Sequence, residues 1–197
     1  GIEELALEAV ELLLEQVALG AHHAQQLAGQ LFALPSGLLA KRNGIGMDKI
    51  ISGNWFNEVD LANIGPDVVK GMRKSSVVVS GTTHPLIQEI TRELYDKNKG
   101  NGDRKFLGDT YYNVGLAIYA PVFEAARLAL LTEKAPLTTE KMRKGLESLK
   151  GYDANGLMPP LNVTAKDHGG GGKSRIDMWD GTKWVPHSDW IADYSDL

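Results

Sequence analysis

The glycine-rich segment 169–174 comes closer than any other stretch of this sequence to a motif that does chemistry. Gly169-Gly170-Gly171-Gly172-Lys173-Ser174 ends like the loop that cradles phosphates in nucleotide-binding proteins. The full pattern needs a glycine at position 167, where this chain has Asp167, and an acid there would repel a phosphate. A helix must also follow, with its N-terminus facing the phosphates, whereas residues 175–179 alternate as in a strand. We therefore expect a flexible glycine loop without a nucleotide.

Nucleophile and metal patterns are incomplete as well. Asp167-His168 and His187-Ser188-Asp189 bring Ser, His and Asp close in sequence, but no strained GxSxG turn or oxyanion hole accompanies them. Adjacent residues on a helix point about 100° apart, so His22-His23 cannot converge on a metal. The chain has no cysteine, which excludes thiol catalysis and cysteine-ligated metals. We expect no catalytic residue, no metal site and no cofactor.

Groups suited to binding follow a short predicted strand at residues 49–52. Asn54, Trp55, Phe56 and Asn57 come directly after it. In open α/β sheets, ligands bind beyond the carboxyl ends of the strands. These residues are therefore candidate ligand contacts. The alternative is that the two aromatic side chains pack beneath a loop.

Tyr111 and Tyr112 are two further candidate ligand contacts. Asp109 or Thr110 is suited to cap a long helix that extends to about residue 131. In the first turn of that helix, free backbone N–H groups can meet an anion, and the phenol hydroxyls can form hydrogen bonds. Packing in the core is the alternative for one of the two tyrosines.

The other predicted elements form an α/β pattern. We expect a strand at 75–80, a helix at 84–97, and a helix from Thr138, as its cap, to about residue 149. Strands at 174–179 and 183–186 should form a hairpin, because Asp180-Gly181 between them is a strong turn signal.

Composition narrows the class of protein. The 197 residues are 43% hydrophobic and 23% charged, as is typical of globular proteins. The net charge of −4 argues against nucleic acid or an anionic membrane as the partner. No run approaches the roughly 18 apolar residues of a membrane span. The acidic start, Gly1-Ile2-Glu3-Glu4, does not resemble a signal peptide.

Residues 1–37 differ from the rest of the chain. Residues 1–40 carry five glutamates and neither Lys nor Arg, and all 21 basic residues follow. Glu4, Glu8, Glu11 and Glu15 repeat at helical spacing, and Leu27, Leu31 and Leu34 do so after Gly20. We predict a helical hairpin here.

Residues 38–197 resemble the C-terminal half of a type 1 periplasmic solute-binding protein, of the kind that serves branched-chain amino acid (Leu/Ile/Val-type) ABC transporters. The resemblance is carried by an ordered series of blocks: 48–56, 64–72, 111–116, 145–149, and an ending from 156–160 through 167–168 to 179–184 and 188–190.

The resemblance implies parts of a two-lobed α/β clamshell joined by crossover strands, one of them at 75–80. Such a protein captures a small solute, here an amino-acid-like or aromatic carboxylate, in the cleft between its lobes. It delivers the solute to an ABC transporter permease from the periplasm, and it is not an enzyme. The loop from Asn54 to Asn57 would line the cleft from one lobe, and Tyr111 or Tyr112 from near the other.

Two features depart from the family pattern. Family members are roughly twice as long, and residues 1–34 match nothing expected before the resemblance begins. A fusion, an unreliable stretch of sequence, or a piece of a larger molecule would each explain this, and we favour a truncated or composite chain. An alternative function is a structural or interaction protein, in which the binding-protein half is a scaffold and residues 1–34 mediate self-association.

Overall fold

A computed structural model of the chain describes residues 39–191. The predicted helical hairpin at 1–37 lies outside the described residues, as do its glutamates and His22-His23. The described chain begins in a helix end that closes at Gly44, whose positive φ of 69° suits glycine.

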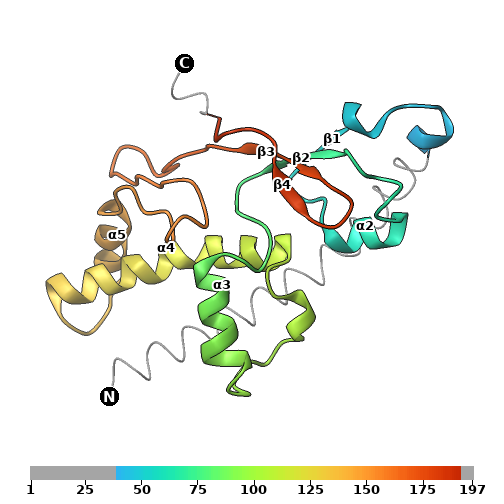
Figure 1. The fold of residues 1–197 in the computed structure, drawn as a ribbon. Helices are drawn as coiled ribbons and strands as arrows, with labels where there is room; N and C mark the ends of the chain where they lie inside the picture. The colour runs from blue at the N-terminus through green and yellow to red at the C-terminus, as the bar shows by residue number, and fades with distance from the viewer. Residues whose placement is uncertain (1–38, 192–197) are drawn as a thin grey trace.

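One four-stranded mixed sheet forms the first part of the fold (Figure 1). Its strands are β1 (Ile51–Ser52), β2 (Arg73–Ser76), β3 (Arg175–Trp179) and β4 (Trp184–Pro186), in the order β1-β2-β3-β4. β1 and β2 are parallel and the other pairs are antiparallel. The predicted hairpin between β3 and β4 is confirmed, and the Asp180 carboxylate holds its turn by accepting from the Thr182 and Lys183 N–H groups.

Helix α2 (Glu58–Ile64) connects β1 to β2. Asn57 caps it, because its side chain accepts from the backbone of Val59 and Asp60 while the Asp60 side chain accepts from the Asn57 N–H. This reciprocal capping box fixes where the helix begins.

Three further helices form the second part of the fold: α3 (Pro85–Ile90), α4 (Thr110–Glu133) and α5 (Thr139–Glu147). A π-helical turn, Thr91–Tyr95, extends α3, so the predicted helix at 84–97 changes its hydrogen-bond pattern midway. Thr138 caps α5 as predicted. α5 lies beside the end of α4 (Figure 1), and Gly145 permits this approach because a Cβ there would overlap the Ala125 carbonyl oxygen.

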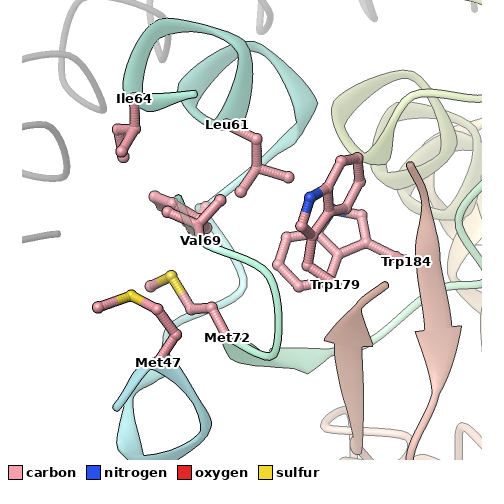
Figure 2. Close-up of a cluster of buried hydrophobic side chains, with 8 residues drawn as sticks. Met47, Leu61, Ile64, Val69, Met72, Trp179 and Trp184 are labelled. Carbon is pink, nitrogen blue, oxygen red and sulfur yellow. The ribbon is translucent and has the colours of Figure 1, made fainter. Parts of the chain in front are cut away.

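Two separate hydrophobic cores divide the described chain. The sheet unit, which comprises β1 to β4 and α2, has a core in which α2 covers the paired indoles of Trp179 and Trp184 (Figure 2). The helix unit, which comprises α3 to α5 and the segment 152–163, has its own core around Ile87, Leu116 and Leu157. Residues 77–84 and 165–174 connect the two units (Figure 1).

Two sequence-based expectations need correction. The predicted strand at 75–80 begins earlier, at Arg73, and leaves the sheet after Ser76; Val79 then bonds to the Leu157 carbonyl of the helix unit, so this segment crosses between units. By length and composition alone, α4 is apolar enough to cross a membrane, because an 18-residue window within Thr110–Thr132 has a mean hydropathy of 1.6. Its first two turns are buried in protein, whereas only 33% of the apolar window as a whole is buried.

Candidate functional site

A cavity of about 880 Å³ lies where the sheet unit meets the loop that leads into α4. It is lined by the start of α2, the crossover 79–83, the loop 105–109 and the strands of the hairpin. Acidic and basic side chains line the cavity, and aromatic side chains form part of its wall. Its lining includes the side chains of Glu58, Ser80, Phe106, Asp109, Arg175 and Trp184.

The first turn of α4 organises the polar side of this cavity. Glu58 accepts from the Thr110 N–H at 3.0 Å and from the Thr110 hydroxyl at 3.1 Å. Asp109 caps the same helix by accepting from the N–H groups of Tyr111 and Tyr112 at 2.7 and 3.0 Å. Two carboxylates therefore occupy the donors at this helix terminus, where the helix dipole favours negative charge.

Lys74 lies beneath the cavity in β2 and is fully buried. Its ammonium donates to the Thr110 hydroxyl at 2.6 Å and lies 4.3 Å from the centre of the Trp184 ring. Burial lowers the pKa of Lys74 to about 8, and the negative charges of Glu58, Asp177 and Asp109 limit that fall.

Burial has the opposite effect on Asp109. Burial and, to a smaller extent, the nearby charge of Glu58 raise the pKa of Asp109 to about 6, against the opposing effect of the backbone bonds from Tyr111 and Tyr112. Asp109 therefore becomes protonated in a mildly acidic range, at the edge of the cavity.

Arg175 supplies positive charge from β3. Its Nε donates to Asp177 at 2.7 Å, and its guanidinium lies 4.9 Å from the centre of the Trp190 ring. Because this bond uses Nε, the two terminal nitrogens of the guanidinium can donate side by side to a carboxylate.

The six predicted contact residues lie beside this cavity and do not line it. Trp55 is 55% exposed, and its carbonyl accepts from the buried Tyr111 hydroxyl, with the two rings 6.2 Å apart. Phe56 packs against Trp184 in the core of the sheet unit. The structure thus brings Trp55 and Tyr111 together.

The other three predicted residues have different surroundings. Asn57 is buried as the cap of α2, and Tyr112 is buried in the core of the helix unit. Asn54 is half-buried, and its Oδ1 has no hydrogen-bond partner among the described residues. Ligand contact by the six residues stays a prediction; the cavity is lined by their chain neighbours Glu58 and Asp109.

Lys74, Arg175 and Trp184 are the site residues that sequence reasoning missed. The sequence placed Arg175 and Trp184 in predicted strands and Lys74 just before one, and it gave none of the three a role in binding. Ser75 and Ser76 separate Lys74 from the valine run 77–79, so the local sequence gives no signal that Lys74 is buried.

The glycine loop and the serine that were considered for catalysis or nucleotide binding have structural roles. The loop 169–174 leads into β3 and not into a helix, as expected. Ser188 donates to the Asp189 carbonyl and accepts from the Ile176 N–H, which ties it to the sheet. Across residues 39–191, no group of three His, Asp or Glu side chains is placed to hold a metal ion.

Solved structures of transport proteins resemble this chain. A protein from the Pseudomonas fluorescens group, described as an ABC transporter permease, is 32% identical with a TM-score of 0.74, over 84% of this chain and 42% of its own. A branched-chain amino acid ABC transporter protein from Thermus thermophilus, solved with bound valine, is 21% identical with a TM-score of 0.60, over 79% and 42%. A scan against protein-family models gives no match, and neither does a search of curated proteins. Because each of the two structural alignments covers 42% of the other protein, this chain spans less than half the length of both.

Proposed function

We propose that this chain, which has the fold of part of a type 1 solute-binding protein of branched-chain amino acid ABC transporters, captures a small solute in the cavity between its two units. The solute would be amino-acid-like or an aromatic carboxylate. The observation that carries this proposal is the cavity of about 880 Å³ with convergent charged groups and an aromatic wall.

The chemistry of the lining supports a solute with both polar and apolar parts. Glu58 and Asp109 suit an amine or hydroxyl, and Arg175 suits a carboxylate. Trp184 and Phe106 suit an apolar or aromatic portion. Capture of this kind needs convergent hydrogen-bond groups and an apolar wall, without a nucleophile.

The role of the whole protein is part of the same proposal. Residues 38–197 would supply parts of both lobes of a clamshell, with residues 1–37 as a separate segment. The protein would act without catalysis, outside the cytoplasmic membrane, and would hand its solute to an ABC transporter permease. Because the cavity comes from less than half of a clamshell, we expect weak affinity for this chain alone.

Calorimetric titration with a panel of amino acids and aromatic acids tests solute capture. We expect heat from at least one member, and weaker binding of that member by Glu58→Gln. Glu89→Gln is the matched control, because it makes the same change on an exposed face of α3 away from the cavity. Absence of heat with every member, in a chain shown by circular dichroism to be folded, would contradict the proposal.

A second candidate function is association with another protein, including self-association. The observation that favours it is an apolar face of α4 that the described residues leave exposed; this face carries Ile118, Val122 and Leu130. Light scattering of the whole chain, of a chain that starts at Leu38, and of Val122→Glu tests this function. Association through α4 predicts a higher mass for the whole chain than for Val122→Glu, and association through residues 1–34 predicts a higher mass than for the chain that starts at Leu38. A monomer in all three would contradict this function.

A further inference from the structure

Groups from three separate segments converge on the hydroxyl of Thr110. Lys74 in β2 lies 2.6 Å from it, Glu58 at the start of α2 lies 3.1 Å from it, and Ser80 in the crossover lies 3.2 Å from it. Lys74 and Glu58 belong to the sheet unit, whereas Thr110 begins α4. The hydroxyl therefore joins the two units at the base of the cavity.

The donors and acceptors at this hydroxyl can be assigned by counting. A hydroxyl donates one hydrogen bond and accepts two. The lysine ammonium has only donors, so Lys74 donates to Thr110. The Glu58 carboxylate has only acceptors, so the Thr110 proton goes to Glu58. One lone pair remains, so Ser80 is the donor in its own contact. The bonding capacity of the hydroxyl is then saturated.

The same turn carries further contacts between the units. The Thr110 N–H donates to Glu58, and the hydroxyl of the next residue, Tyr111, donates to the Trp55 carbonyl. Glu58, Ser80 and Asp109 all line the cavity. A change in the spacing of α2 and α4 must therefore change the width of the cavity.

We propose that Thr110 is a positioning residue, whose hydroxyl holds the sheet unit against the first turn of α4 and so sets the width of the cavity. It acts through Glu58, Lys74 and Ser80, and it does not line the cavity itself. The effect on solute affinity rests on the proposed function, whereas the effect on the spacing of the two units does not.

The test compares Thr110→Val, which keeps the shape and removes all three bonds to the hydroxyl, with Thr110→Ser, which keeps the hydroxyl. Thr132→Val is the matched control, because the hydroxyl of Thr132 bonds only to carbonyls of its own helix in the described structure. The chain has no cysteine, so Asn63→Cys on α2 and Lys144→Cys on α5 give two exposed spin-label sites, one on each unit. Double electron–electron resonance then reports the distribution of distances between the units.

We expect a single narrow distribution in the parent chain, in Thr110→Ser and in Thr132→Val, and a broad distribution in Thr110→Val. Calorimetry should show about a tenfold or greater loss of solute affinity in Thr110→Val alone, because the cavity is then no longer held at the width that fits the solute. Circular dichroism establishes that each variant keeps the helix content of the parent chain. A distribution in Thr110→Val as narrow as in the parent chain would overturn the proposal, and so would equal broadening in Thr110→Ser.

Two further outcomes are also decisive. If Thr110→Val does not fold, Glu58→Gln carries the test, because the amide removes a charge and one acceptor with little change in shape; an unchanged distribution there would overturn the proposal. If the distances respond as expected while no solute binds to any variant, the positioning role stands and the proposed solute function fails.

Discussion

The charge of Asp109 should reduce the stability of this fold at neutral pH. Asp109→Asn tests this directly, because an amide oxygen can still accept from the N–H groups of Tyr111 and Tyr112 and preserve the cap of α4. The substitution removes the negative charge that lies beside Glu58 in a buried place. We therefore expect a more stable protein.

The size of the gain follows from the pKa of Asp109, which folding raises from 3.8 to about 6. A rise of roughly two pKa units corresponds to about 3 kcal/mol. A folded pKa above the unfolded one means that the folded state holds the proton more tightly. The free energy of unfolding of the parent chain should therefore fall as pH rises from 3.8 to 6, and stay lowered above that range. The gain in Asp109→Asn should be near zero below pH 3.8 and complete above pH 6.

Urea unfolding followed by circular dichroism between pH 3.5 and 8 measures this gain. Asp67→Asn is the control, because it makes the same substitution at an exposed side chain of the sheet unit. A loss of stability in Asp109→Asn at pH 7, or a gain that does not depend on pH, would refute the reasoning that burial and Glu58 oppose the charge.

Three further stability predictions concern separate features. In the parent chain the free energy of unfolding should rise between about pH 8 and 10.5, because folded Lys74 loses its proton before the unfolded chain does; Lys74→Met should lack this rise in urea titrations. Gly145→Ala should cost about 1–3 kcal/mol, since a Cβ there forces α5 away from the Ala125 carbonyl, and an unchanged thermal midpoint would contradict this. Thr138→Ala should cost about 1 kcal/mol through loss of the cap on Lys141, whereas Thr138→Ser should restore most of it.

Elements with strong local signals could be predicted from the sequence. α4 begins after Asp109 because that side chain caps it, and the β3–β4 hairpin turns at Asp180-Gly181 because those residues favour the turn. α2 was missed because it is short, yet Asn57 followed three residues later by Asp60 is a capping signal that could have found it.

The candidate site depended on contacts that are distant in sequence. Lys74 bonds to Thr110, which lies 36 residues away, and no local pattern predicts that bond. For Phe56 the sequence left open ligand contact or packing beneath a loop, and in the structure it packs against Trp184, which belongs to the C-terminal hairpin. The sequence therefore pointed to the neighbourhood of the cavity, while sheet pairing decided which side chains line it.

Hydrogen exchange with and without a bound solute tests the proposed capture most directly. Residues 79–83 and 105–109 approach the cavity from different segments of the chain. We predict that a saturating solute from the calorimetric panel slows amide exchange in both segments, and leaves α5, which lies away from the cavity, unchanged. A solute that binds without protecting either segment, or a panel in which no member changes exchange anywhere, would contradict capture in this cavity.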